Sequence, residues 1–433
     1  MRPSYFTRDL LVALANLAWS APLLAQVAQA QDQDRAVATP SSRLDRLATI
    51  RGDGPETTIT GRPGEGFKIS AGDAYSLAVL SWLQPQYRFL ARDALNPASN
   101  GAGTDTSSFG LRAARTRFSG NLFDKDIEYR LSSEWTENNA VKDAWLRWTF
   151  WRSERDAIAL RFGQQKPLYG RESTAEDWKL DFVDRALATR SFASSRSRGV
   201  MLLGEHLEGK LHWSAAAFES DVAAASSNAG EEAANPDNEL DYVFSIRLDP
   251  RGDMGDESYS EGDLDHTQDL LWSVGAALQL GNHRTTLGGA TVDADGRDIN
   301  MHGALKYQGL HVLGEVFLRS DDPDVPGARS SDSTGWQVGG TYTLARREGK
   351  NGQWSFGGRY SRISLDDAAQ AVLTATPLGP SKGDVDEITA LVGFYYRAHK
   401  IKLQGSWTLQ EVKPSGSNSA TNQILELQFQ FLF

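Results

Sequence analysis

The chain ends in the stretch LELQFQFLF, residues 425–433, and this stretch decides the fold class. Leucine or phenylalanine occupies every second position, and a glutamate or a glutamine lies at each position between them up to Phe431. Successive side chains of a β-strand point to opposite faces of the sheet, so the pattern predicts a strand with one apolar and one polar face. The segment IKLQGSWTLQ, residues 401–410, alternates in the same way and predicts the strand before it.

Similar segments of about ten residues recur from residue 75 to the end of the chain. If these strands close into a bacterial membrane barrel whose two chain ends lie on one side of the membrane, their number is expected to be even. Residues 282–296 interrupt the pattern, and we predict an external loop there, although residues 285–291 could pair. We predict about sixteen strands, near residues 75–91, 111–123, 126–136, 140–151, 156–165, 198–206, 211–219, 239–249, 268–281, 297–308, 310–320, 335–346, 352–364, 385–397, 399–411 and 422–433.

The polar faces of these strands distinguish a membrane barrel from a soluble β-sandwich, which also alternates. A sandwich would need many apolar residues on both sides of its core, whereas the polar faces here carry Arg, Glu, Gln, Ser and Thr. That is expected when one face meets lipid and the other a water-filled lumen. The sequence therefore predicts an all-β fold, a transmembrane antiparallel β-barrel with long external loops and short periplasmic turns, such as 123–125 and 398–400. Aromatic residues near strand ends would suit the interfacial girdles, namely Trp145, Trp148, Trp151, Tyr395 and Tyr396.

The N-terminal region reads as an export signal followed by a linker. Arg2 and Arg8 precede an apolar run at residues 10–24, and the small-x-small site Ala-Gln-Ala lies at residues 28–30, which is the order of a secretory signal peptide. Residues 31–66 are polar with several Pro and Gly, so we predict a flexible periplasmic segment there. The barrel domain is then expected at residues 67–433.

Composition excludes several classes of partner and site. The formal net charge is -11, and removal of residues 1–30, whose net charge is +1, leaves -12, which argues against nucleic acid as a partner. The absence of cysteine excludes disulfides and thiolate metal sites. We expect no cofactor and no metal site. An acidic run at residues 253–265 is interpreted as a solvated periplasmic turn, because its spacing does not match a calcium-binding loop.

A long connection, residues 166–197, is the first candidate for a functional loop. Long loops are usually functional or disordered, and a loop that folds into a wide barrel narrows the lumen. Acidic residues are also present, so the local excess of positive charge is small. The basic residues are Lys166, Arg171, Lys179, Arg185, Arg190 and Arg196, and the acidic ones are Glu172, Glu176, Asp177, Asp181 and Asp184.

Arginines on the neighbouring strands form a second basic set. If the apolar positions face lipid, the lumenal positions include Arg115, Arg117, Arg130, Arg147 and Arg161. These side chains could form an arginine stripe for the passage of anions. Alternatively they could form an ion-pair lattice with Glu128, Glu134 and Asp143 on the same faces, because wall charges in a wet pore commonly pair. The sequence leaves both interpretations open.

At several stretches the sequence resembles a known family, the phosphate-selective porin O and P family of outer-membrane porins. The similarity covers most of residues 67–433, and its order and spacing are more specific than any one stretch. The similar stretches are FGQQKP at 162–167, FVDRA at 182–186, RGVM at 198–201, GWQVGGTYTL at 335–344, GGRYS at 357–361 and the last hairpin.

The resemblance implies a homotrimer of sixteen-stranded barrels in the Gram-negative outer membrane, in contact with lipid and lipopolysaccharide. It also implies an inward-folded third loop with the selectivity site, and transport of anions such as phosphate or polyphosphate. Lys166, Arg185, Arg190 and Arg198 occupy matching motif positions, and we predict that they line the pore together with Arg171.

Two departures weaken the phosphate assignment. The family usually has an apolar or aromatic residue at the position of Gln165. The outer loops are also acidic, and acidic entrances would repel a dianion over about one Debye length. The acidic residues are Asp221, Glu231, Glu232, Asp237 and Glu239 in one loop and Asp321, Asp322 and Asp324 in another.

Four functions follow as hypotheses. The first is a porin that passes small anions through a lumen lined by the arginine stripe and by Arg185 and Arg190. The second is a general or weakly cation-preferring porin, in which the acidic loops dominate. An outer-membrane hydrolase is a third, although the seven histidines show no motif spacing. The fourth is a structural or adhesion barrel with a plugged lumen.

Overall fold

The computed structural model describes residues 56–92, 105–136, 140–219, 239–254, 259–287, 290–347, 351–365, 383–414 and 419–433. The predicted signal peptide at residues 1–30 and the first part of the predicted flexible segment, residues 31–55, lie outside the described residues. The chain divides into the units Met1–Glu56 and Thr57–Phe433, and the second contains the barrel. None of the helices in the described part is long and apolar enough to cross a membrane.

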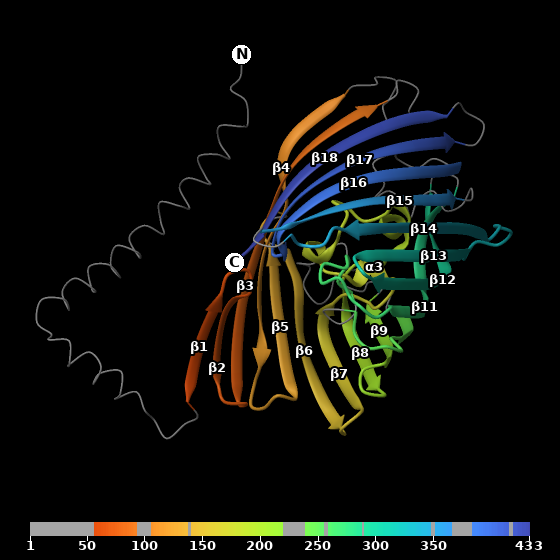
Figure 1. Ribbon diagram of the computed structural model, residues 1–433. Coiled ribbons are helices and arrows are strands. Elements are labelled where there is room, and N and C mark those ends of the chain that lie inside the picture. The colour runs from red at the N-terminus through yellow and green to blue at the C-terminus, as the bar shows by residue number, and fades with distance from the viewer. Residues whose placement is uncertain are drawn as a thin grey trace, which may run out of the picture. The chain divides into compact units, whose positions relative to one another are not determined.

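Within the described residues, sixteen strands, β3 to β18, form one closed antiparallel barrel (Figure 1). Each strand pairs with the next in the chain, and β18 pairs with β3, for example at Leu427 and Tyr87. Closure pairs the edge strands, which a sheet in lipid requires. All sixteen predicted strands are confirmed: β3 Tyr75–Arg92, β4 Thr106–Asn121, β5 Ile127–Glu134, β6 Ala140–Arg152, β7 Ala157–Gln165, β8 Ser197–His206, β9 Leu211–Glu219, β10 Leu240–Leu248, β11 Leu271–Leu287, β12 Ala290–Tyr307, β13 Leu310–Pro323, β14 Ser331–Thr343, β15 Gln353–Leu365, β16 Gly383–His399, β17 Ile401–Pro414 and β18 Ala420–Leu432.

The two faces of the strands differ as the alternation predicts. In β18 the apolar Leu427 is 47% exposed on the outer face, whereas Gln428 and Gln430, on the inner face, are 2% and 0% exposed. Trp148, Trp151 and Tyr396 likewise lie on the outer face, as the girdle interpretation requires. That interpretation is wrong for two of its residues, because Tyr395 is fully buried inside the barrel and Trp145 lines a cavity in the lumen.

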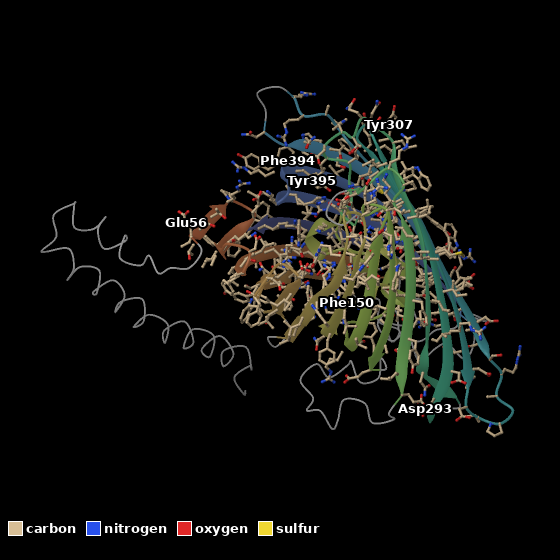
Figure 2. All side chains as sticks on the ribbon, turned by 90° about the horizontal axis from the view of Figure 1, so that it is seen from below. Glu56, Phe150, Asp293, Tyr307, Phe394 and Tyr395 are labelled. Carbon is tan, nitrogen blue, oxygen red and sulfur yellow. The ribbon has the colours of Figure 1, made fainter. Side chains whose placement is uncertain are left out.

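Two segments that were not predicted as strands extend the sheet beyond the membrane. β11 and β12 pair as far as Leu287 and Ala290, so the external loop predicted at residues 282–296 is wrong. Asp293 lies at the far end of this long hairpin from Tyr307 (Figure 2). In the outer part of β12 the period is present, since Ala290, Val292 and Ala294 alternate with polar residues. Its partner at residues 282–286 is polar at every position, so this half of the hairpin carries no two-residue signal.

A second hairpin lies at the other end of the barrel, where the short turns are. β1 (Thr57–Arg62) pairs with β2 (Gly66–Ala71), and β2 pairs with the first residues of β3 below the end of β18. The hairpin is largely exposed, and its apolar residues Ile59, Phe67 and Ile69 lie on one face. The predicted flexible segment is therefore paired as strands over its last residues, 57–66, except at the turn.

The inward loop, residues 166–196, is the third external connection and folds inside the barrel (Figure 1). It contains α3 (Arg171–Thr174), the 3-10 turn η3 (Asp177–Lys179) and α4 (Leu187–Phe192). Phe192 of α4 stacks on Phe317 of β13 at 5.9 Å between ring centroids, and both side chains are buried. This apolar contact fixes the loop to one half of the wall and confirms the inward third loop that the resemblance implies.

A glycine on β14 makes this contact possible. A Cβ at Gly335 would lie 2.6 Å from Phe192 Cε2 and 3.3 Å from Ala188 Cβ. The first distance requires the Phe192 ring to move, and the second requires a small shift of α4. β14 therefore presents no side chain at this position, and α4 lies directly against the strand.

We expect Gly335→Val to displace the inward loop and to destabilise the barrel by about 1–3 kcal/mol, the usual cost of overpacking. Single-channel conductance should change, and the free energy of unfolding in detergent micelles should fall. Gly358→Val is the matched control, because a Cβ there lies 3.9 Å from its nearest neighbour on the outer face. Equal effects of the two substitutions would contradict this explanation of the loop position.

Candidate functional site

Hydrogen bonds hold the inward loop against the strands of one half of the barrel. Glu172 accepts hydrogen bonds from Arg359 (2.9 Å) and Gln337 (3.0 Å). Further along, the Asp181 carboxylate accepts a hydrogen bond from the Tyr395 hydroxyl at 2.7 Å. All five side chains are at most 6% exposed. Buried charges and carboxylates are stable only when paired or hydrogen-bonded, so these contacts determine the position of the loop.

The opposite side of the loop faces six arginines on the adjacent strands β4 to β7, which we call the arginine wall. Arg112 binds Asp184 at 3.0 Å, and Arg115 binds Asp177 at 3.1 Å. Arg117 and Arg130 share the carboxylate of Glu176. The arginine wall consists of Arg112, Arg115, Arg117, Arg130, Arg147 and Arg161.

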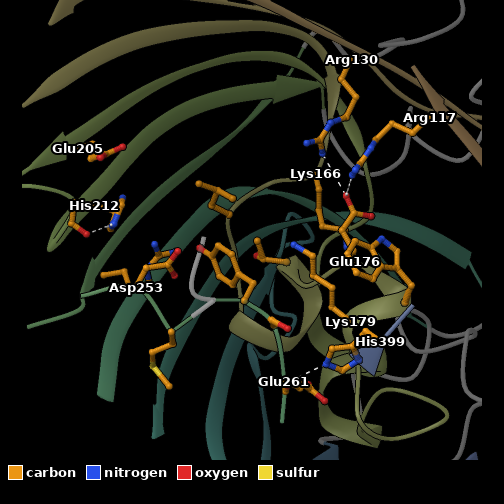
Figure 3. Close-up of a pocket in the computed structure, with 18 of the residues that line it drawn as sticks. Arg117, Arg130, Lys166, Glu176, Lys179, Glu205, His212, Asp253, Glu261 and His399 are labelled. Carbon is orange, nitrogen blue, oxygen red and sulfur yellow. Dashed lines mark hydrogen bonds and ion pairs between the residues drawn. The ribbon is translucent and has the colours of Figure 1, made fainter. Parts of the chain in front are cut away.

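Glu176 of the inward loop binds two guanidinium groups at once (Figure 3). Its Oε1 lies 3.5 Å from Arg117 and 3.3 Å from Arg130. Arg147 pairs with Glu128 at 2.8 Å within the wall, and Arg161 lies over the Trp145 ring at 5.2 Å. The predicted stripe therefore exists, and most of it is also an ion-pair lattice.

The basic residues of the inward loop are mostly engaged with the loop itself. Arg185 binds Asp177 at 2.6 Å and the Ala175 carbonyl at 2.7 Å. Arg190 pairs with Glu387 of β16 at 2.8 Å. Lys166 donates to the carbonyls of Ser173 and Ala175.

Burial and the neighbouring cations Arg185 and Arg196 hold the pKa of Lys166 well below its usual value. Arg196, by contrast, pairs with the Asp143 carboxylate at 2.9 Å.

Two of the predicted pore-lining residues lie elsewhere. Arg171 is 3% exposed and donates to Ser273 of β11 at 3.2 Å, on the side of the loop away from the arginine wall. Arg198 pairs with Glu219 of β9 at 2.7 Å. It lies on the outer face of β8, because Met201, three residues further along the strand and therefore on the opposite face, is fully buried inside. The prediction that Arg198 lines the lumen is wrong, since it relied on the motif and not on the alternation.

A cavity of about 1330 Å³ lies beside the arginine wall and the inward loop (Figure 3). Arg117, Arg130, Arg147 and Arg161 line it, together with Trp145. The Trp145 ring is also 5.1 Å from the Arg130 guanidinium. Trp145 was predicted for the interfacial girdle, although its position between Asp143 and Arg147 on the polar face indicates the lumen.

The described parts of the acidic connection between β10 and β11 lie against the inward loop and the cavity, and we call residues 249–254 and 259–270 the lumenal insert. Its backbone meets the inward loop through Glu261 N–H and the Lys179 carbonyl at 3.1 Å. Asp263 accepts a hydrogen bond from Gly309 N–H at 2.6 Å and is 2% exposed. The interpretation of this run as a solvated turn is therefore wrong for Glu261 and Asp263, which accept hydrogen bonds from backbone N–H groups of distant segments that the local sequence does not reveal. Asp253 and Asp265 are exposed, and residues 255–258 lie outside the described residues.

Among the titratable groups of the insert, Glu261 has the pKa that departs furthest from its usual value. Its Oε2 accepts a hydrogen bond from Asp181 N–H at 2.6 Å, and the side chain is 6% exposed. Burial, with the nearby carboxylates of Glu172 and Asp181, raises its pKa to about 8. Arg359 lowers the pKa and only partly offsets these effects. Glu261 is therefore mostly protonated at neutral pH, which permits the contact between the insert and the loop.

We expect Glu261 to make the barrel less stable as the pH rises. The folded protein keeps this proton up to about pH 8, whereas an unfolded glutamate loses it near pH 4.3. The free energy of unfolding should therefore fall between these values. Glu261→Gln should reduce the fall, measured by urea unfolding at pH 5 and pH 9. The exposed Glu208→Gln serves as the control, and a Glu261→Gln profile parallel to the wild-type profile would contradict the assignment.

Comparisons with known proteins agree with this geometry. The family model of the phosphate-selective porin O and P matches residues 88–433. No curated protein matches the chain in sequence. Among the described residues, no group of three or more His, Asp or Glu side chains fits a metal ion.

Solved outer-membrane proteins share the fold at low identity. A loop-deletion mutant of OmpT from Vibrio cholerae is 14% identical, with a TM-score of 0.50 over 83% of this chain and 100% of that one. The outer membrane channel DcaP of Acinetobacter baumannii is 13% identical, with a TM-score of 0.50 over 84% and 99%. OprB of Pseudomonas putida is 10% identical, with a TM-score of 0.52 over 83% and 94%.

At such identities the solved structures support the barrel fold alone, whereas the family match covers most of the chain. The family match, together with the closed barrel and the inward third loop, makes the chain a channel and not an enzyme. The chain is a porin of the Gram-negative outer membrane and belongs to the phosphate-selective porin O and P family.

Proposed function

We propose that the protein allows passive diffusion of small anions, phosphate among them, between the inward loop and the arginine wall. The observation that carries this proposal is the excess of positive charge on four adjacent strands. The six arginines of the wall share the inner face with Glu128, Glu134 and Asp143 among the described residues of β4 to β7. A cationic surface in a narrow lumen lowers the energy of a passing anion.

The ion pairs reduce this positive charge without cancelling it. Arg117 and Arg130 share Glu176, so one carboxylate balances two guanidinium groups. Both guanidinium groups belong to the lining of the cavity. A guanidinium group presents five N–H donors, which suits bidentate contact with phosphate or carboxylate oxygens. An anion that reaches this position gains charge-assisted hydrogen bonds.

A general or weakly selective porin is the second candidate, and one observation favours it. Among the described residues that line the cavity, ten are lysine or arginine and ten are aspartate or glutamate. The cavity as a whole therefore has no formal net charge, and any preference for anions must come from the side that bears the arginine wall.

We further propose that the protein is a homotrimer embedded in outer-membrane lipid and lipopolysaccharide. The exposed apolar side chains on the outer face of the strands, such as Leu425, Leu427 and Phe429, support contact with lipid. The trimer follows from the family resemblance.

The charge of the wall predicts opposite effects for two sets of substitutions. Arg117→Gln with Arg130→Gln should lower the anion-to-cation permeability ratio, because Glu176 then lacks its partners. Glu176→Gln should raise the ratio. We expect changes of a few-fold, since a partly exposed charge contributes up to about 1 kcal/mol and about 1.4 kcal/mol is tenfold. Reversal potentials in a salt gradient across planar bilayers measure the ratio.

Arg198→Gln is the matched control for these variants, because Arg198 pairs with Glu219 outside the lumen. Its reversal potential should equal that of the wild type. Cation selectivity of the wild-type protein would reject the anion proposal and leave the second candidate.

Phosphate binding can be tested separately from selectivity. If the wall binds phosphate, millimolar phosphate should reduce the chloride current of the wild-type channel. The reduction should disappear in the Arg117→Gln, Arg130→Gln variant and persist in Arg198→Gln. Chloride current that is insensitive to phosphate would leave an anion channel without a phosphate site.

A further inference from the structure

The charges that line the cavity are divided between two sides. The cationic side consists of wall and inward-loop residues, and seven cations there accompany the carboxylates Glu128, Asp143 and Glu176. Four of these cations belong to the arginine wall. The seven are Arg117, Arg130, Arg147, Arg161, Lys166, Lys179 and Arg196.

The acidic side consists of the turn between β8 and β9 and the lumenal insert. Five carboxylates and the mostly protonated Glu261 lie there with the cations Arg247 and Lys306. The remaining lining charges, Glu65 and Lys400, pair with each other at the rim. The six acidic residues are Glu205, Glu208, Asp253, Glu261, Asp263 and Asp265.

The two sides face each other across the open space (Figure 3). Arg117, Arg130 and Lys166 lie together beside Glu176, whereas Glu205 and Asp253 lie on the other side of the pocket. With roughly 30 Å³ for each water molecule, the cavity of about 1330 Å³ holds about forty. A small solute therefore fits together with part of its hydration shell.

We infer that this cavity is a binding chamber for zwitterionic solutes, small molecules that carry an ammonium and a carboxylate group apart from each other, such as amino acids. The carboxylate of such a solute lies toward the arginine wall, and its ammonium group lies toward the lumenal insert. The proposed anion pathway concerns the passage at the inward loop. The chamber is a further property of the lumen beside it.

The division of charge, and not the net charge, carries this inference. An anion gains energy from the cationic side and loses energy to the carboxylates of the acidic side, and the opposite holds for a cation. A solute with both charges gains at both sides in one orientation. Opposite charges within a Debye length of about 8 Å interact appreciably at physiological salt.

The accessible members of the acidic side lie on the insert and the β8–β9 turn. Glu205, Asp253 and Asp265 are exposed and line the cavity, whereas Glu261 and Asp263 are buried. Glu208 pairs with Arg155 at 3.2 Å. The ammonium group of a solute therefore meets chiefly Glu205, Asp253 and Asp265.

The test compares three solutes of similar length as blockers of ion current through the wild-type channel in planar bilayers. These are 6-aminohexanoate, hexanoate and hexylammonium. We expect 6-aminohexanoate to halve the current at a concentration about two- to fivefold lower than either singly charged solute, which corresponds to one added ion pair of partly exposed groups. The advantage should shrink in 1 M salt, where the Debye length falls to about 3 Å.

The variant with Asp253→Asn and Asp265→Asn removes two exposed carboxylates without changing the size of the chamber. Its block by 6-aminohexanoate should become equal to its block by hexanoate. The control variant carries Asp322→Asn and Asp324→Asn, two exposed carboxylates near the external end of β13. This control should keep the advantage of the zwitterion.

Equal block by 6-aminohexanoate and hexanoate in the wild type would overturn the chamber, and so would an advantage that survives Asp253→Asn with Asp265→Asn. These outcomes are independent of the anion proposal. A reversal potential that shows anion selectivity, without zwitterion block, rejects the chamber alone. Zwitterion block in a cation-selective channel rejects the anion proposal alone.

Discussion

The pairing of charges inside the barrel is the constraint on which the rest of the structure depends. Closure of the sheet places every second strand residue in the lumen, and many of these residues are charged. The inward loop and the lumenal insert then displace much of the lumenal water, so these charges need partners in the protein. The ion pair of Arg359 with Glu172, whose side chains are 4% and 2% exposed, shows the result. An unpaired charge at such a site would cost several kcal/mol.

The same constraint determines where the inward loop lies. Its apolar residues on α4 pack against β13 to β15, where Gly335 leaves room for Phe192. Its carboxylates then face the arginine wall, and Asp184, Asp177 and Glu176 meet a row of guanidinium groups from adjacent strands. The loop thus separates a closed half of the lumen, filled by hydrogen bonds, from an open half that contains the cavity. The arginine wall belongs to the open half.

Most of the barrel could be predicted from the sequence, because lipid on one side and water on the other impose a two-residue period. The same period placed Arg115, Arg117 and Arg130 correctly in the lumen. It also contradicts the motif-based placement of Arg198, which lies opposite the buried Met201. In the missed hairpins the period is short or confined to one strand. β2 has six residues, in which Phe67, Ile69 and Ala71 alternate with Lys68 and Ser70, and at residues 282–296 only the β12 half alternates.

The lumenal insert could not be predicted for a different physical reason. Its polar residues carry no periodic signal, and their partners are far away in the chain. Asp263 depends on Gly309, and Glu261 depends on Asp181, 80 residues away. Only the closed barrel brings these groups together. A short acidic segment reads as a solvated turn until the fold supplies its hydrogen-bond donors.

Because nearly every charge near the passage is paired, selectivity arises from a small difference between large opposing sets of charges. The external carboxylates contribute little to that difference. Arg117 lies eleven residues from Thr106, the first residue of β4 at the external end. At about 3.3 Å for each residue the separation along the strand is roughly 35 Å, several Debye lengths at physiological salt. In the proposed anion pathway, exposed carboxylates near the external end of β13, such as Asp322 and Asp324, therefore act on the arrival of an anion, and the partners of the arginine wall act on its preference inside.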